Sequence, residues 1–303
     1  MTQTGLMTAG GVRRMDAAVQ ARPARRARQW ELVEFAAEGS LARIYRARPA
    51  GTPASQPAGY AVKMLRPEWQ DEPEAIRLLQ REALVGRSVS HPHLAPVLSA
   101  AVSDPPRLLV MPWLSGASLR ARLDAGRRFD VASTLWIIRQ AAEALDALHA
   151  AGWMHGDVSP GNLHLSPSGH VTLIDLSFAK RQDETGSVAD RPVVGTFYYL
   201  APEHVTSSLA ADIRSDIYSL GAVMFEMLAG RVPFEGRDLA ELALAHRESP
   251  PPDLARLAPE VPREVAHLVR RMLAKNPLLR PQTPRELIGR LVRLEVAAFS
   301  QRA

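Results

Sequence analysis

Two polar side chains, Asp157 and Asn162, stand five positions apart in the segment "HGDVSPGN", and a second carboxylate, Asp175, follows them. The short apolar runs "LHL" and "VTLID" lie between Asn162 and Asp175 and are joined by a Ser-Pro-Ser-Gly turn, which predicts a hairpin. Such a hairpin would bring the loop before its first strand close to Asp175 at the end of its second. Carboxylate and amide oxygens suit a magnesium ion that also holds phosphate oxygens. The spacing therefore indicates phosphate chemistry.

The elements that must position these groups fall into two parts. Short β-type runs dominate from Trp30 to about Val110, with one helical stretch at residues 72–89. From Ser118 onward helical patterns dominate, as at residues 134–152 and 215–230. We expect an α+β chain with two lobes, a small N-terminal antiparallel sheet with one main helix and a larger, mainly helical C-terminal lobe. The Pro- and Gly-rich residues 47–60 are expected to form a long hairpin loop.

Composition is that of a globular protein. The chain has 303 residues, of which 46% are hydrophobic, so it can bury a sizeable core. The absence of cysteine excludes disulfides and thiolate metal sites and fits a reducing cytosol, so we expect a cytoplasmic protein. The longest apolar run, from Ile217 to Ala229, is interrupted by Glu226 and is shorter than the roughly 20 residues of a membrane span. We therefore expect no transmembrane segment.

Charge is concentrated at the N-terminus. Residues 1–29 hold six arginines and one acid, a net charge of +5 that equals the net charge of the whole chain. This stretch has no hydrophobic core segment, which excludes a secretory signal. We expect a disordered basic tail, and a weak contact of this tail with nucleic acid or an acidic surface is the alternative.

Further motifs follow the order of a known family. The third strand of the first lobe carries "AVK" with Lys63, the following helix carries Glu82, and "LLVMPWLSG" comes next. Together with "HGDVSPGN" and "VTLID", these segments resemble the bacterial eukaryotic-like (Hanks-type) serine/threonine protein kinases, from about Trp30 to Leu291. The resemblance implies a protein-kinase-like fold. It also implies that Lys63 holds the α- and β-phosphates of ATP and that Glu82 pairs with Lys63.

The same resemblance implies the remaining roles. Asp157 would accept or orient the hydroxyl of a Ser or Thr in a protein substrate, while Asn162 and Asp175 would bind Mg²⁺ or Mn²⁺. The segment from Met111, the gatekeeper position, to Leu114 resembles the hinge between the lobes. The implied nucleotide-binding residues are Ala37, Gly39, Ala42, Ile44, Ala61, Lys63, Met111, Pro112, Leu114 and Leu163.

The resemblance also implies an organisation of the chain and several structural contacts. The kinase domain would cover residues 30–296, with a first lobe at about 30–111, a hinge at about 112–116, a second lobe at about 117–296 and a C-terminal tail at 297–303. In "GTFYYLAPEH", Thr196 would lie near the catalytic loop and Glu203 would pair with Arg280. Asp216 would hold the backbone of the catalytic loop from below.

Several positions depart from the family pattern. Only Gly39 remains of the three glycines that cover the phosphates, and Ser177 replaces the glycine after Asp175 and Leu176. Gly156 replaces the arginine that would grip a phosphate on the activation segment, and Ser159 replaces a catalytic lysine. Loss of that lysine removes a charge beside the transferring phosphoryl group, which would slow transfer.

Three functions are therefore compatible with the sequence. The first is a protein kinase that uses Mg-ATP, and the second is a nucleotide-binding pseudokinase that acts as a scaffold. The third is a small-molecule phosphotransferase, because aminoglycoside and choline phosphotransferases resemble the "HGD" and "PGN" segments. The Ala-Pro-Glu motif and the helix beginning "SDIYSLG" favour the protein kinase, and Thr196 favours Ser or Thr as its acceptor.

Overall fold

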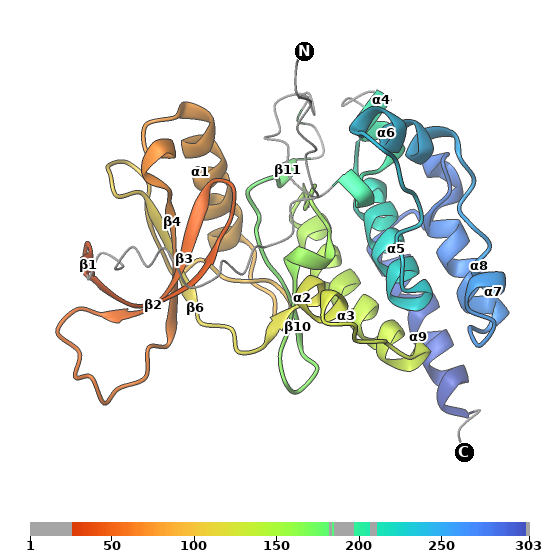
Figure 1. Ribbon diagram of the computed structural model, residues 1–303, viewed down its shortest axis with the longest axis horizontal. Helices are drawn as coiled ribbons and strands as arrows, with labels where there is room; N and C mark the ends of the chain where they lie inside the picture. Colours follow the sequence, from red (N-terminus) through yellow and green to blue (C-terminus); the bar gives the residue numbers. More distant parts are fainter. Residues whose placement is uncertain (1–25, 182–183, 185–196, 207–210, 301–303) are drawn as a thin grey trace, which may run out of the picture.

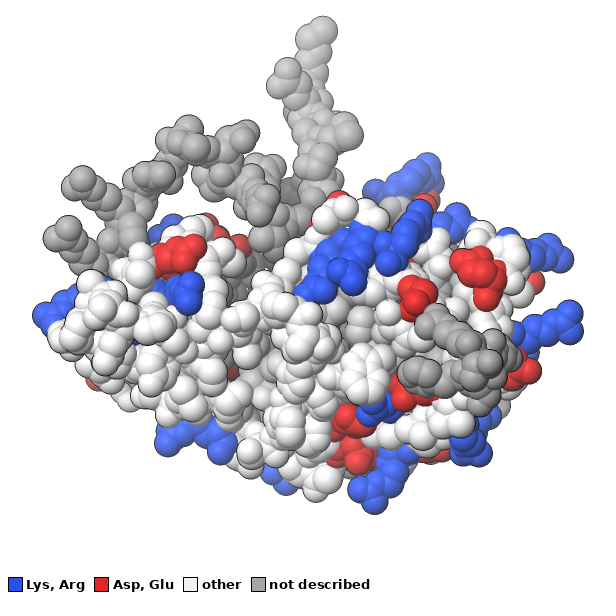
Figure 2. All heavy atoms as spheres, turned by 90° about the horizontal axis from the view of Figure 1, so that it is seen from below, with Lys and Arg blue, Asp and Glu red and all other residues white. Residues whose placement is uncertain are grey.

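The chain folds into two lobes that lie side by side, one built on a sheet and one built from helices (Figure 1). The computed structural model describes residues 26–181, 184, 197–206 and 211–300. The predicted fold class is confirmed, because an antiparallel sheet with one main helix precedes a larger helical lobe. On the face shown in Figure 2, acidic and basic side chains are intermixed, in keeping with the equal number of acids and bases after residue 29.

The first lobe is a six-stranded antiparallel sheet in the order β1-β2-β3-β4-β6-β5. Alternate residues face its core, where Val62 and Val110 are buried. The long loop predicted for residues 47–60 is present at residues 50–59, where it connects β3 to β4. The strands are β1 (Arg26–Ala27), β2 (Trp30–Glu38), β3 (Ala42–Pro49), β4 (Tyr60–Leu65), β5 (Ser99–Ala101) and β6 (Leu108–Pro112).

Helix α1 (Pro73–Ser88) packs against this sheet and carries Glu82 on its buried face. A proline in the first turn, with acidic Glu74 there and basic Arg87 in the last turn, suits the helix ends. Ala75, Leu79, Glu82, Ala83 and Gly86 are buried at helical spacing. A Cβ atom on Gly86 would lie 2.6 Å from Val97 Cγ2, so glycine allows the close approach of the helix to the segment before β5. This packing directs Glu82 toward the sheet.

Helix α5 (Ile213–Ala229) is the centre of the second lobe, and its residues from Ser215 to Leu228 are all buried. Asp212 caps its first turn by accepting from the Arg214 amide, and Gly230 ends it with a φ of 71°. The remaining helices of this lobe are α2 (Leu119–Asp124), α3 (Val131–Ala150), α4 (Pro202–Thr206), α6 (Leu239–Glu248), α7 (Leu254–Leu257), α8 (Arg263–Met272) and α9 (Pro284–Ser300).

Short strands lie where the lobes meet. The predicted hairpin is present as β9 (Leu163–Leu165) and β10 (Val171–Leu173), which pair antiparallel, and β7 (Ala117–Ser118) pairs with β9. Strand β8 (Trp153–Met154) pairs with β11 (Lys180–Arg181). The segment "HGDVSPGN" (residues 155–162), called the catalytic loop below, therefore starts from β8 and ends at β9, so strands hold both of its ends.

A short strand, β1, precedes the predicted start of the domain at Trp30. Arg26 and Ala27 pair with Glu31 and Trp30 as the first hairpin of the sheet, and Ala27 is buried. The disordered tail is predicted from the overall composition of the basic stretch, and one buried alanine between two arginines, Ala27, does not change that composition. Of the disordered tail predicted for residues 1–29, residues 1–25 lie outside the described residues. Helix α9 continues past residue 296, the predicted end of the domain.

Candidate functional site

The catalytic loop is held from below by a buried carboxylate, as predicted. Asp216 on α5 accepts hydrogen bonds from the backbone amides of His155 (2.6 Å) and Gly156 (2.8 Å). Gly156 has a φ of 78°, in the left-handed region where a residue without Cβ meets no steric penalty. The loop backbone is therefore fixed by α5, and a glycine suits its sharpest bend.

Asp157 and Asn162 contact each other within this loop. The side-chain amide of Asn162 donates to the Asp157 carboxylate (2.8 Å) and to the Asp157 carbonyl (2.7 Å). The amide of Ile174 donates to the Asn162 carbonyl (2.9 Å), so Asn162 lies against the backbone that leads to Asp175. With its nitrogen turned to Asp157, the Asn162 side chain leaves its oxygen to act as a metal ligand.

Lys63 on β4 joins the two lobes by contacting two carboxylates. Its Nζ lies 2.6 Å from Glu82 Oε2 and 3.0 Å from Asp175 Oδ1. Glu82 is 3% exposed at its side chain, whereas Asp175 is 35% exposed. The predicted pairing of Lys63 with Glu82 is therefore present, and Asp175 shares the same ammonium group.

One ammonium group cannot fully neutralise two carboxylates, and their pKa values differ accordingly. Burial raises the pKa of Glu82 to about 7, and Asp175 adds to this while Lys63 opposes it. Burial also acts to raise the pKa of Asp175, but Lys63 and hydrogen bonds from Ser177 outweigh it and hold the pKa at about 2. The pKa of Lys63 is raised, because the two carboxylates outweigh its burial. Glu82, the more deeply buried carboxyl, therefore holds its proton more tightly, and the negative charge rests on Asp175.

Ser177, which replaces a family glycine, holds the Asp175 carboxylate. Its hydroxyl donates to Asp175 Oδ1 at 2.7 Å, and its amide approaches the same oxygen at 3.3 Å. Asp175 has a φ of 65°, which is uncommon for a residue other than glycine. Leu176 between them is buried. Asp175 is therefore oriented by a hydroxyl that glycine would not supply.

The loop between β2 and β3 is a tight turn in which Gly39 donates to the Ala42 carbonyl (2.8 Å). The Trp69 indole donates to the Ser40 carbonyl (3.0 Å), and the Arg66 amide donates to the Leu41 carbonyl (2.9 Å). Gly39 does not adopt a positive φ here. The turn can therefore form without the two missing glycines.

Most of the predicted nucleotide-binding residues are brought together by strand register. Ala37 lies opposite Ile44, Ile44 opposite Lys63, and Ala61 opposite Met111. Just past β6, the Trp113 amide donates to the Gly59 carbonyl (2.9 Å), so the loop before β4 supports the hinge. The sheet thus places Ala37, Gly39, Ala42, Ile44, Ala61, Lys63, Met111, Pro112 and Leu114 on or beside neighbouring strands.

Leu163 does not belong to this group. It is fully buried in the hydrophobic core of the second lobe, so it offers no surface to a nucleotide. The next residue, His164, points to the opposite face of β9 and contacts the backbone of Ser115 and Leu114 at the hinge. The alternation in "LHL" was the signal that could have distinguished the buried Leu163 from His164, which faces the hinge.

Ser159 and Thr196 are the two remaining residues that were predicted to take part in catalysis. Ser159 is 7% exposed and precedes a short 3₁₀ helix (Pro160–Asn162) in the catalytic loop. Thr196 lies outside the described residues. Within the described ranges no group of three or more His, Asp or Glu side chains is arranged to hold a metal ion. Asn162 and Asp175 fit a cation that takes its other ligands from phosphate or water.

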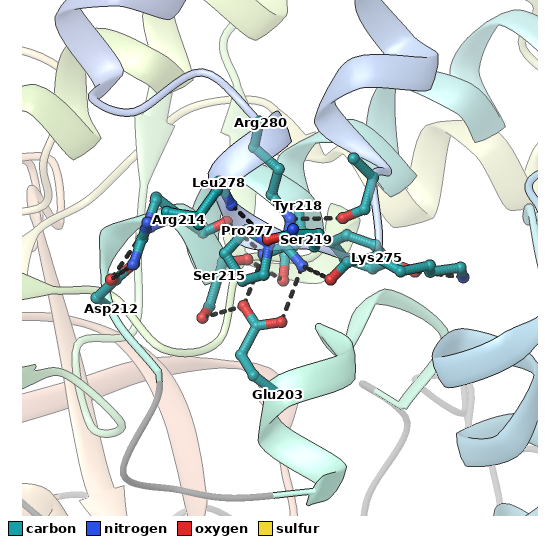
Figure 3. Close-up of polar contacts among 12 residues, drawn as sticks. Glu203, Asp212, Arg214, Ser215, Tyr218, Ser219, Lys275, Pro277, Leu278 and Arg280 are labelled. Atoms are coloured by element: carbon teal, nitrogen blue, oxygen red, sulfur yellow. Dashed lines mark hydrogen bonds and ion pairs between the residues drawn. The ribbon is translucent and has the colours of Figure 1, made fainter.

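The predicted pair of Glu203 and Arg280 is present in the second lobe (Figure 3). Arg280 Nη1 lies 2.6 Å from Glu203 Oε1, and Nη2 lies 2.8 Å from Oε2. Ser215 also donates to Glu203 Oε1 at 2.6 Å, and the Tyr218 ring lies 4.8 Å from the guanidinium carbon. Burial acts to raise the pKa of Glu203, but Arg280 outweighs it and lowers that pKa. This pair joins α4 to the loop before α9.

Comparison with known proteins identifies the class of this fold and site. Residues 31–289 match the family model described as the protein kinase domain. The chain is 35% identical to the serine/threonine-protein kinase PknA of Mycobacterium tuberculosis over 73% of its length and 51% of that protein. It is 30% identical to the serine/threonine-protein kinase PrkC of Bacillus subtilis over 75% of its length and 35% of that protein.

The chain therefore belongs to the protein kinase domain family, as its motif order predicted. It spans between about a third and a half of the length of the two relatives named above. Among the described residues, the helices are all too short or too polar to cross a membrane.

Proposed function

We propose that this chain is an active protein kinase that transfers the γ-phosphate of ATP to Ser or Thr of a protein substrate. The contact of Lys63 with both Glu82 and Asp175 carries the proposal, because it joins a phosphate-binding lysine to a metal-binding carboxylate across the two lobes. The similarity to bacterial serine/threonine-protein kinases supports a hydroxyl acceptor in a protein.

We assign the catalytic roles within the loop as follows. Asp157 accepts or orients the substrate hydroxyl, and the Asn162 amide fixes its carboxylate by the hydrogen bond of 2.8 Å. Asp216 keeps the loop in this shape through two backbone amides. Transfer therefore rests on positioning, because phosphoryl transfer requires little covalent chemistry from the protein.

The nucleotide and its metal are assigned to groups at the junction of the lobes. Lys63 holds the α- and β-phosphates, and Asn162 and Asp175 hold Mg²⁺ or Mn²⁺ through oxygen. The metal, when bound, neutralises negative charge on the phosphate oxygens. The adenine lies between the sheet and the hinge, where Ala61, Met111 and Leu114 are assigned to it together with His164. Residues 26–300 are proposed to form the kinase unit, and its use of ATP supports action in the cytoplasm.

The test is transfer of radiolabelled phosphate from ATP with magnesium or manganese to a generic basic protein. Asp157→Asn should abolish transfer while the affinity for ATP stays within about twofold, because the substitution removes a carboxylate that contacts the acceptor. Asp146→Asn, at a carboxylate on α3 that pairs with the exposed Arg285, serves as the matched control and should keep full activity.

The outcomes separate the three functions. Incorporation into protein supports the proposal, and full activity of Asp157→Asn contradicts it. Incorporation into small alcohols alone would indicate a small-molecule phosphotransferase. ATP binding with no incorporation into either would indicate a scaffold.

A further inference from the structure

An ion pair connects helix α1 to the segment that follows β11, across 103 residues of sequence. Arg81 Nη1 donates to Glu184 Oε2 at 2.7 Å, and Arg81 Nη2 contacts Glu184 Oε1, so the pair is bidentate. The side chains are 29% and 34% exposed. Burial acts to raise the pKa of Glu184, but the hydrogen bonds from Arg81 and Arg181, together with the positive charges of Arg81 and Lys180, outweigh it and lower that pKa. Glu184 is therefore a carboxylate with a fixed partner on α1.

Trp153 connects the same pair to the catalytic loop. The guanidinium carbons of Arg81 and Arg181 each lie 5.5 Å from the centre of the Trp153 ring, which is almost fully buried. Arg181 also pairs with Trp153 between β11 and β8, and its amide donates to Glu184 Oε2 at 3.2 Å. One cluster thus joins helix α1, Glu184 and the strand that leads into "HGD".

The position of Arg81 on α1 connects this cluster to the contact between Glu82 and Lys63. Arg81 is the immediate neighbour of Glu82, which contacts Lys63 at 2.6 Å. A change in the position or rotation of α1 would therefore move both side chains together. Glu184 holds the helix where Glu82 reaches Lys63.

This chain lacks the arginine by which related kinases bind a phosphate on the activation segment, the part of the chain between Asp175 and Glu203. In related kinases an arginine at the position of Gly156 grips a phosphate on the activation segment. Here that position is glycine with a φ of 78°, and its amide binds Asp216. A carboxylate that is permanently charged at neutral pH can play the part of a phosphate when an arginine faces it in bidentate geometry.

We propose that Arg81 and Glu184 are positioning residues, and that their ion pair holds α1 in its active position without phosphorylation of the segment after β11. This proposal rests on the proposed function, and it specifies how that function is regulated. The pair replaces a switchable phosphate with a fixed carboxylate, so the arrangement of Lys63 and Glu82 is present from the time the chain folds.

The test uses the full chain with three variants, Glu184→Gln, Arg81→Gln and the exchange Arg81→Glu with Glu184→Arg. Each single variant should lower kcat/KM about fivefold, in the range of a partly exposed ion pair, and the exchange should recover at least half of the loss. Hydrogen exchange of the α1 amides should be faster in the single variants and return toward the wild-type rate in the exchange.

Arg290→Gln is the matched control. Arg290 pairs with Glu286 on α9 at similar exposure, 34% and 35%, but lies on the second lobe away from α1. It should leave both kcat/KM and exchange of α1 unchanged. Because hydrogen exchange needs no turnover, an inactive wild-type chain would contradict the proposed function while exchange still tests the coupling.

A second measurement addresses phosphorylation itself. Wild-type protein stripped by a phosphatase, and shown by mass spectrometry to carry no phosphate, should transfer phosphate at its first turnovers as fast as untreated protein. A lag that ends as the chain phosphorylates itself would overturn the proposal. So would single variants with unchanged exchange in α1, or an exchange variant no better than the singles.

Discussion

Two buried ion pairs among the described residues, Glu203 with Arg280 and Glu82 with Lys63, differ in how completely their charges are satisfied. Arg280 has five N–H groups, and each finds an acceptor, two on Glu203 and three on backbone carbonyls. Lys63 instead faces two carboxylates, and one of these, Glu82, has a pKa raised to about 7. The first pair is complete, whereas the second carries excess negative charge.

This difference in neutralisation distinguishes an ion pair that supports the fold from an ion pair at the candidate site. A pair with all of its donors and acceptors used has one favourable arrangement, so it fixes the segments that it joins. A cluster with one carboxylate in excess can accept a further cation at Asp175, which is the more exposed of the two acids. We infer that incomplete neutralisation marks the part of the structure that is meant to receive a ligand.

The largest expected effect comes from breaking the complete pair. Arg280→Met leaves the Glu203 carboxylate buried without its cation and removes three hydrogen bonds to backbone carbonyls, so we expect a loss of about 3–5 kcal/mol in the free energy of unfolding. Chemical denaturation measures this loss. Arg290→Met, at a pair one third exposed, is the control and should lose less than about 1 kcal/mol. Similar losses in both variants would show that burial does not distinguish the two pairs.

An intermediate effect is expected in the pH dependence of stability. Glu82 has a folded pKa raised to about 7, so its proton stabilises the fold below the unfolded pKa near 4.5, and that contribution is lost as pH rises through 7. The free energy of unfolding of wild type, relative to Glu82→Gln, should therefore fall by about 1–3 kcal/mol between pH 5 and pH 8.

For the pair of Glu203 and Arg280, the pH dependence of the free energy of unfolding has the opposite sign. The pKa of Glu203 is lowered, so its contribution is present above the unfolded pKa and is lost only as pH falls below about 4.5. Glu203→Gln should therefore show a constant difference from wild type between pH 5 and pH 8. If the free energies of unfolding of wild type and Glu82→Gln change in parallel between pH 5 and pH 8, the pKa of Glu82 is not raised in the folded protein.

The smallest expected effect concerns Ser177, which makes the incomplete cluster more ordered than a glycine would. Ser177→Ala removes a hydrogen bond to the Asp175 carboxylate, worth about 1 kcal/mol, so the magnesium concentration for half-maximal activity should rise about fivefold. Ser177→Thr keeps the hydroxyl and serves as the control. An unchanged magnesium requirement in Ser177→Ala would mean that Asp175 is oriented by its backbone alone.

Local patterns predicted a large part of this molecule. The hairpin from Leu163 to Leu173, helix α1 and the buried helix α5 each follow from periodicity and turn residues that act over a few positions. The pair of Glu203 and Arg280 followed from motif order. The strand at Arg26–Ala27 was missed, because two paired residues in a basic stretch give no periodic signal.

The sequence by itself determined the two lobes, the order of the motifs and the residue types that phosphate chemistry needs, because these depend on short-range pattern. Only the tertiary structure decided which face of β9 meets the hinge, how Lys63 divides its charge and that Arg81 meets Glu184. These outcomes depend on burial and on contacts between distant segments. Burial sets the cost of each charge, and no local pattern records it.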